Sequence, residues 1–125
     1  MSISNYLEDK VLDKVFRNID FSVTGVYTSL HAGDPGETGA NEISATGAYV
    51  RQGVVFGAAS GGAISNNGAI TYTAMMPSGT ITAVGLWDAV ASGNHLWNGN
   101  LSASKNVNQG DTFQIANGDL DISLD

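Results

Sequence analysis

The chain has 125 residues, with 16 glycines and no cysteine, and its 5 basic and 12 acidic residues give a net charge of −7. So acidic a surface repels phosphate and anionic lipid, which argues against nucleic acid and membranes as partners. Without cysteine there are no disulfides, thiolate metal sites or cysteine nucleophiles. The length predicts one domain over residues 1–125, and the glycine-rich, proline-poor composition favours short strands and tight turns. No run resembles a signal peptide or a membrane span, so we expect a protein that is made in a cytoplasm and kept or assembled there.

The N-terminal part, residues 1–19, predicts an amphipathic helix from Asn5 to about Arg17. Its apolar residues recur at helical spacing: Leu7, Val11, Leu12, Val15 and Phe16, with Ile19 just beyond. Asn5 with Glu8 resembles a capping box, and Lys14 and Arg17 complement the helix dipole at the other end. Two interpretations stay open. The favoured one is a lid over one end or open face of a sheet, and the other is a docking or oligomer contact.

Residues 20–125 predict about eight short antiparallel strands. Thr80 to Trp87 is expected to be the central strand because both its faces are apolar, and a turn leads from it towards Trp97. The other strands are expected at residues 23–30, 49–56, 69–73, 105–107, 112–116 and 120–124, with a short one inside 57–68. The last two are predicted to form a closing hairpin across residues 117–119. This pattern is typical of an all-β antiparallel sandwich, jelly-roll-like, behind one N-terminal helix.

The segment from His31 to Glu42 reads as an acidic surface loop containing Asp34, Glu37 and Glu42. Clustered carboxylates can bind calcium, but the spacing matches no EF-hand. A solvated loop is the favoured interpretation. We therefore expect neither a metal nor a cofactor.

Catalytic patterns are absent from the sequence. The two histidines, His31 and His95, accompany no serine-centred motif, and the candidate carboxylates lie in turns. We expect no enzyme activity and no catalytic residues. Aromatic residues could instead stack on sugar faces in a glycan-binding module: Trp87, Trp97 and Tyr27. The alternative is that both tryptophans belong to the core, and the exposure of their indoles separates the two interpretations.

Three stretches carry a resemblance to a known family: YTSLHAGDPGETGANEIS, YVRQGVVFGAASGGAISN, and ITAVGLWD with the residues that follow it to the C-terminus. Together they resemble small tailed-bacteriophage virion proteins, over nearly the whole chain from Leu7 to Asp125. Members of that family are labelled tail-fibre or minor tail proteins, and similar β-sandwich trimers decorate phage capsids. The resemblance implies a structural role, in which the motif residues define turns and strand ends: Asp34, Pro35, Gly36, Glu37, Thr38, Gly39, Trp87, Asp88, Lys105 and Asp111.

The resemblance and the short chain together predict a non-enzymatic structural protein of the virion, specifically a trimeric capsid decoration or cement protein. A tail-fibre, tail-tip or baseplate component is the first alternative, and a glycan-binding module the second. The expected partners are further copies of the chain, in a homotrimer that buries strands such as Val54–Phe56, and the major capsid protein or tail proteins. The candidate interaction surface comprises residues of the helix and the acidic loop: Leu7, Val11, Val15, Asp34, Glu37 and Glu42.

Overall fold

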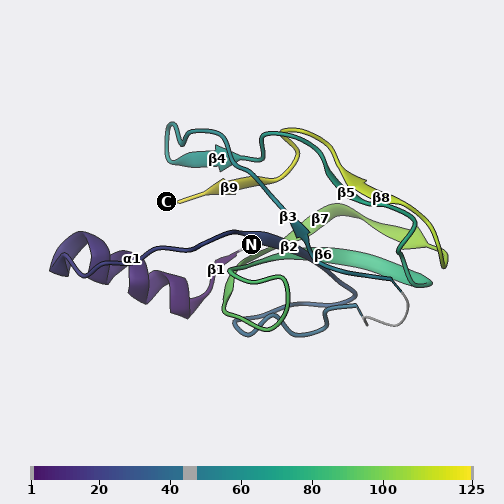
Figure 1. Ribbon diagram of the computed structural model, residues 1–125, viewed down its shortest axis with the longest axis horizontal. Helices are drawn as coiled ribbons and strands as arrows, with labels where there is room; N and C mark the ends of the chain where they lie inside the picture. The colour runs from purple at the N-terminus through teal and green to yellow at the C-terminus, as the bar shows by residue number, and fades with distance from the viewer. Residues whose placement is uncertain (1, 44–47, 125) are drawn as a thin grey trace.

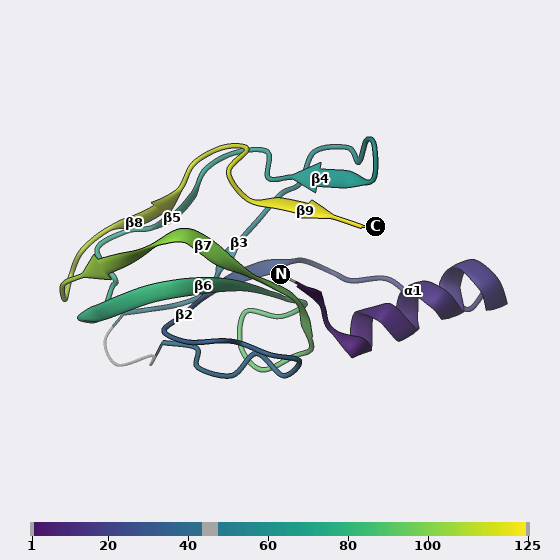
Figure 2. The same ribbon diagram turned by 180° about the vertical axis from the view of Figure 1, so that it is seen from behind.

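The computed structural model describes residues 2–43 and 48–124, which form one helix and nine strands (Figure 1). In chain order the elements are β1 Ser2–Ile3, α1 Asn5–Arg17, β2 Tyr27–His31, β3 Gln52–Gly53, β4 Ala63–Ser65, β5 Ile70–Tyr72, β6 Gly79–Trp87, β7 His95–Val107, β8 Phe113–Ile115 and β9 Asp121–Ser123. A five-stranded sheet has the order β1-β7-β6-β2-β3, and two further sheets pair β4 with β9 and β5 with β8. Figures 1 and 2 show both small sheets above one face of the large one. The predicted all-β antiparallel sandwich with an N-terminal helix is confirmed.

The hairpin of β6 and β7 is the centre of the large sheet, as the two-sided apolar pattern predicts. β6 pairs with β7 on one side and with β2 on the other, from Tyr27 opposite Trp87 to His31 opposite Ala83. β7 is much longer than expected: the segment predicted as a short strand at residues 105–107 is the end of a 13-residue strand. Register shifts interrupt the ladder twice, which lets a long strand bend over the core.

The predicted closing hairpin is wrong. β8 pairs with β5 and β9 pairs with β4, so the chain between them crosses from one small sheet to the other. Asn66 fixes this crossover, because its amide donates to the Ala116 carbonyl and accepts from the Leu120 amide. The turn predicted at residues 117–119 is therefore present, but the Asn66 side chain, 50 residues earlier in the chain, determines which strands pair on either side of it.

The strand expected at residues 49–56 is mostly irregular. Only Gln52–Gly53 forms β3, and Phe56 adds one isolated bridge to Asn66. Val55 is 68 % exposed, so this segment is not an apolar strand buried within one copy. The strand expected at residues 23–30 is likewise confined to β2.

The core lies between the large sheet and the two small ones. It contains Leu30, Tyr72, Met76, Ile81, Val84, Leu86, Leu96 and Trp97, among others. Trp87 and Trp97 are only 8 % and 4 % exposed. Their burial identifies both indoles as core groups and removes the tryptophan platform that a sugar would stack on.

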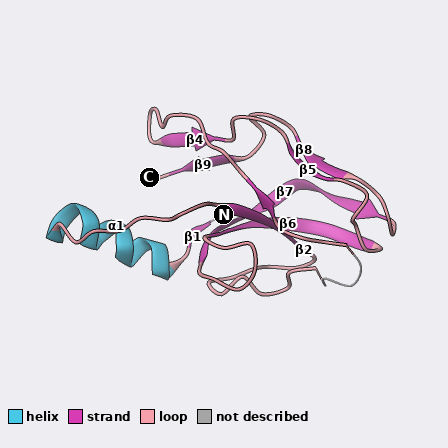
Figure 3. Cartoon of the chain, in the orientation of Figure 1, coloured by secondary structure: helices cyan, strands magenta, loops and turns pink. Residues whose placement is uncertain are grey.

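Helix α1 has the predicted bounds but a different cap and a different role. Its N-cap is Ser4, whose hydroxyl accepts from the Leu7 amide, and not Asn5. It projects away from the sandwich (Figure 3), and no residue between Asn5 and Arg17 is buried. Only the start of the helix covers the sandwich as the expected lid would, because Tyr6 and Leu7 pack against the core whereas Leu12, Val15 and Phe16 are exposed. No helix in the described part of the chain is long and apolar enough to span a membrane.

Candidate functional sites: a buried polar cluster and an apolar groove

The acidic loop at residues 31–42 is a structured element at the end of the large sheet. His31 and Glu42 form a β-bridge, and the Ala32 amide donates to the Asn41 carbonyl, so the loop closes on itself. Inside it, the Asp34 carboxylate accepts from the Gly36 amide at 3.0 Å. The loop is therefore held by local hydrogen bonds of the kind that aspartate makes in turns.

Arg51 is the centre of a buried polar cluster that joins three parts of the chain. Its guanidinium donates twice to the Glu42 carboxylate, at 2.9 and 2.8 Å, and twice to the turn after β6, at the carbonyls of Ala89 and Ser92. It also lies 3.8 Å from the centre of the Trp87 ring, in cation–π geometry. Only 8 % of the Arg51 side chain is exposed. The arginine thus ties the loop, its own segment and the β6–β7 turn together.

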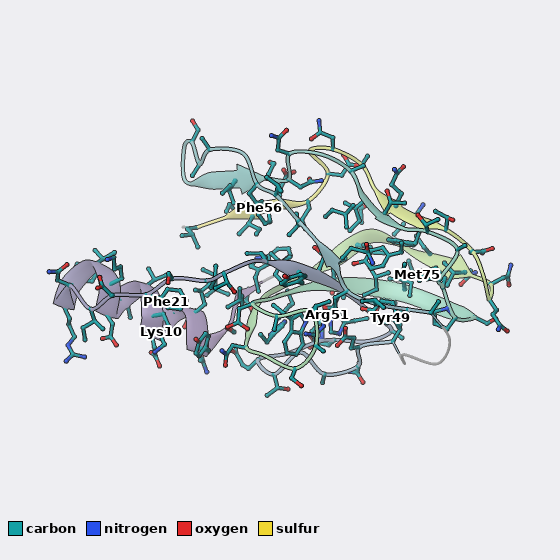
Figure 4. The ribbon with its side chains drawn as sticks, in the orientation of Figure 1. Lys10, Phe21, Tyr49, Arg51, Phe56 and Met75 are labelled. Carbon is teal, nitrogen blue, oxygen red and sulfur yellow. The ribbon has the colours of Figure 1, made fainter. Side chains whose placement is uncertain are left out.

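Glu42 is fully engaged in this cluster. Burial alone would raise its pKa, but hydrogen bonds from Arg51 and Tyr49 outweigh burial and lower the pKa of the carboxyl. The Tyr49 hydroxyl donates to Glu42 at 2.9 Å and accepts from the Leu30 amide at 3.0 Å. Burial raises the pKa of Tyr49. Figure 4 shows Tyr49 and Arg51 close together beside the large sheet. Glu42, a predicted interaction residue, is therefore a structural residue of this copy.

Ser29 and His31 form a pair that resembles a nucleophile and its base. The Ser29 hydroxyl lies 2.7 Å from His31 Nε2, while His31 Nδ1 lies 2.7 Å from the Ala40 carbonyl. The group behind the histidine is thus a backbone carbonyl, where a catalytic triad has a carboxylate. Both side chains are completely buried, and the Trp87 indole donates to the Ser29 oxygen at 2.8 Å. The pair is shielded from solvent in this structure, and the contact of His31 with the Ala40 carbonyl connects β2 to the loop.

His95, at the start of β7, completes the cluster. Its Nδ1 lies 3.2 Å from the Glu37 carbonyl, and its Nε2 is buried without a hydrogen-bond partner among the described residues. The ring packs over Gly85, where an added Cβ would lie only 2.7 Å from Ser29 Oγ and 2.8 Å from His31 Nε2. Desolvation lowers the pKa of both histidines, so both are neutral in this setting at neutral pH.

The three acidic residues of the loop at residues 31–42 have different partners in the structure. Asp34 closes its turn, Glu42 binds Arg51, and the Glu37 carboxylate accepts from the Asn5 amide at 2.6 Å, at the start of α1. Glu37 therefore links the loop to the helix, the two parts of the predicted interaction surface. The described residues hold no group of three or more histidines and carboxylates that could bind a metal.

An apolar groove of about 420 Å³ lies between α1 and the β4–β9 sheet. We define this apolar groove by residues from both sides: Leu7, Val11, Phe21, Phe56, Ile122 and Leu124. Figure 4 labels Phe21 and Phe56 on its two sides. None of the described residues that line it has a charged side chain. Two of the predicted interaction residues, Leu7 and Val11, thus line one continuous apolar hollow.

Beyond the groove, the apolar face of α1 is open to solvent. Leu12, Val15 and Phe16 are 54 %, 65 % and 78 % exposed, and Val11 is 37 % exposed. The exposure of this apolar stripe rises along the helix as it leaves the sandwich. Large contiguous apolar surfaces on soluble proteins mark interaction sites. Val15 was predicted for this surface, whereas Leu12 and Phe16 were missed as site residues although they lie in the same stripe.

The polar cluster is internal to the β-sandwich, and helix α1 exposes apolar side chains to solvent. These are features of a structural protein that functions by assembly. Residues 2–123 match the model of the family described as Podophage GP4 fiber I protein gp80, and the chain belongs to that family. The resemblance to tailed-phage virion proteins is confirmed, and the protein is a virion component. No curated protein matches the chain. Membership in a fibre family agrees with the expected structural role.

The family motifs meet in the polar cluster. The D-P-G-E-T-G stretch supplies the Glu37 carbonyl, 3.2 Å from His95 Nδ1, the Tyr-x-Arg stretch supplies Arg51, and the G-x-W-D stretch supplies Trp87. The sequence analysis interprets Glu37 and Trp87 as residues of turns and strand ends and places Arg51 on a strand, and it misses that the three belong to one site. The signal that could have found it was a lone arginine among apolar residues, since a buried arginine requires an acidic partner.

Proposed function

We propose that this protein is a building block of a virion fibre and that the apolar stripe of α1 is its assembly element. The observation that carries this proposal is the exposure of the stripe: a helix in the same chain as a complete β-sandwich core presents Leu12, Val15 and Phe16 to solvent. Burying such side chains is the main favourable term in most protein association. The family description, which names a fibre protein, supports the same role.

The proposed assembly contains several copies of the chain, specifically a homotrimer. Cyclic symmetry closes an assembly of identical subunits and protects exposed strand edges. The two small sheets have such edges, and the exposed Val55 lies close to the end of β4, because its carbonyl accepts from the Asn67 amide. The net charge of −7 is compatible with a protein that stays soluble until it assembles.

The polar cluster has a supporting part in this proposal. Glu37 accepts from the first amide of α1, and Ser4 donates to the carbonyl of His95, so the start of the helix is fixed to the cluster. The helix therefore leaves the sandwich in a defined direction. A helix that already has a fixed direction loses less conformational entropy when the copies assemble.

A capsid decoration protein is the second candidate. It is favoured by the sequence, which has no internal repeat of the kind expected for a long fibre shaft. Binding across neighbouring capsid subunits would stabilise the shell by mass action. The apolar stripe would then face capsid protein.

The number of copies per particle separates the two candidates. We would quantify this protein against the major capsid protein in purified virions by mass spectrometry. A fibre component is expected at a small fraction of the capsid protein, and immunogold labels should gather on fibres or the tail. Copy numbers comparable to the capsid protein, with label spread over the shell, would overturn the fibre proposal in favour of decoration.

The role of α1 needs its own test in phage that carry the altered gene. The double substitution Val15→Asp and Phe16→Asp places charge on the stripe without touching a buried residue. Val90→Asp is the matched control, since Val90 is also about half exposed, at 48 %, but lies in the turn between β6 and β7, outside the helix. Loss of the protein from virions with the double variant, but not with the control, is the expected result. Equal incorporation of both variants would remove α1 from the proposal.

A further inference from the structure

We infer that the partner of α1 is α1 of neighbouring copies, and that these helices pack side by side in a parallel bundle around the symmetry axis. The inference rests on the proposed role of the helix in assembly and names its partner. Four features of α1 carry it: its length, the width of its apolar stripe, the position of its charges and its attachment to the sandwich.

The length of α1 shows that it needs a partner. A helix of 13 residues is marginal in water on its own, and most helical stability in proteins comes from packing an apolar face. The helix is tied to the sandwich chiefly at its start: Ser4 bonds to His95, Glu37 accepts from Asn5, and Leu7 packs against the core. From Leu12 onward its apolar side chains are more than half exposed. The second half of α1 therefore lacks the packing that a short helix requires.

The stripe is wider than the sandwich can cover. At about 100° per residue, Leu7 and Val11 lie at one edge of the stripe, Val15 in the middle, and Leu12 and Phe16 towards the other edge. The first two line the groove of their own copy, which leaves the rest for another chain. Glu8 is the one charged residue of α1 that falls within the angular range of the stripe, and it lies in the first turn of the helix. The free part of the stripe thus begins beyond Glu8.

The charges on either side of the stripe favour packing of α1 against α1 of another copy, with the two helices parallel. Lys14 and Lys10 follow one edge, and Asp9 and Asp13 follow the other. In a parallel cyclic bundle, the basic edge of each helix faces the acidic edge of the next. In an antiparallel pair, each edge would face its own kind, and like charges repel. The charge pattern is therefore complementary to itself only in the parallel arrangement.

The existing ion pairs leave this pattern available. Arg17 pairs with Asp13 at 3.0 Å on the back of the helix, and Lys14 contacts Asp20 at 3.2 Å. Both pairs are exposed, and exposed pairs contribute little to stability. Lys14 can therefore turn to a neighbouring helix at small loss. A parallel bundle would also direct the sandwiches of all copies to the same end, as a fibre requires.

The test uses the purified 125-residue chain and measures its mass in solution by light scattering. The expected mass is about three times the 12.9 kDa of one chain for the proposed trimer. Val15→Asp with Phe16→Asp should reduce it to that of one chain, while Val90→Asp should not. Near-UV circular dichroism from the buried tryptophans verifies that each variant keeps its sandwich. A monomeric wild-type chain, or an oligomer that the double variant does not dissociate, overturns the inference.

Charge exchange tests the parallel arrangement. Lys10→Glu with Lys14→Glu puts acid on both edges of the stripe and should shift the chain towards monomer. Adding Asp9→Lys and Asp13→Lys gives the two edges opposite charges again and should restore the oligomer. An oligomer unaffected by the two lysine substitutions, or one that the two aspartate substitutions fail to rescue, overturns the parallel bundle. A monomeric chain that is nevertheless found in fibres would defeat this inference and the proposed homotrimer, while the proposed fibre role would hold with α1 bound to another virion protein.

Discussion

The guanidinium of Arg51 lies 3.8 Å from the centre of the Trp87 ring, and the same guanidinium is paired with Glu42. Trp87 in turn donates to Ser29, which lies against His31. One arginine thus connects the acidic loop, the end of the central strand and the turn after it. The stability of this end of the molecule should depend on that residue more than on any exposed charge.

Arg51→Ala is expected to destabilise the fold by about 3 kcal/mol, because it leaves Glu42 partly buried without its partner and removes the stacking on Trp87. The stability of Arg51→Lys should lie between that of the wild type and that of Arg51→Ala, since an ammonium keeps the charge but not the double hydrogen bond to Glu42. Urea unfolding followed by tryptophan fluorescence measures both. Arg17→Ala is the control, because its ion pair with Asp13 is exposed and should contribute less than about 0.5 kcal/mol. Equal losses for Arg51→Ala and Arg17→Ala would contradict the prediction.

The start of α1 gives a second prediction. The Ser4 hydroxyl is completely buried, accepts from the Leu7 amide and donates to the His95 carbonyl at 2.5 Å. Ser4→Ala should therefore lower the free energy of unfolding by about 1–2 kcal/mol, as loss of an N-cap does. Asn5→Ala should change it by less than about 0.5 kcal/mol, since Asn5 contributes its backbone amide and not its side chain. A larger effect at Asn5 would restore the capping box that the sequence predicts.

The sequence predicted those features that depend on neighbours in the chain. The bounds of α1 follow from apolar spacing and terminal charges within 13 residues, and the central strand follows from its two apolar faces. The cap was placed one residue late because Ser4 and Asn5 are both good capping residues. What distinguishes them is the His95 carbonyl, which is 91 residues away.

Features that depend on distant side chains could not be predicted. The turn at residues 117–119 is typical of a hairpin, but Asn66 bonds on both sides of it and directs β8 and β9 to different sheets. Similarly, Tyr49 and Arg51 alternate as strand residues do, yet their side chains are bound to Glu42 and the local backbone stays irregular. The polar cluster combines residues from four separate stretches, and no spacing rule connects them.

The loop glycine Gly39 gives a third prediction. It has φ +75° and packs directly against the Trp87 ring, so that an added Cβ would overlap the ring. Gly118 has a similar φ of +83° but no atom near an added Cβ, which makes it the matched control. Gly118→Ala should cost about 1 kcal/mol for the backbone alone. Gly39→Ala should cost a further 1–3 kcal/mol, roughly, for overpacking. Equal thermal and urea stabilities for the two variants would show that the loop moves aside freely.

The last prediction concerns pH, because burial lowers the pKa of His31 and of His95 below the ordinary value of 6.5. The groups around His31 are Glu42, His95, Arg51 and the Ala40 carbonyl. When the pH falls below 6.5, the unfolded chain binds protons that the folded chain does not, so stability falls. Above 6.5 both states hold neutral histidines and this contribution is complete.

Glu42 acts in a separate and lower window. Its pKa is lowered from 4.5, so its contribution is complete above pH 4.5 and is lost as the pH falls below that value. Urea unfolding at a series of pH values between 7.5 and 5 should therefore show a decline in wild type that reports the histidines alone. His95→Gln removes one of the two titrating groups and should make this decline shallower. A stability that stays flat or rises as the pH falls from 7 to 5.5 would show that the buried histidines accept protons in the folded state, with the loop reorganised to admit the charge.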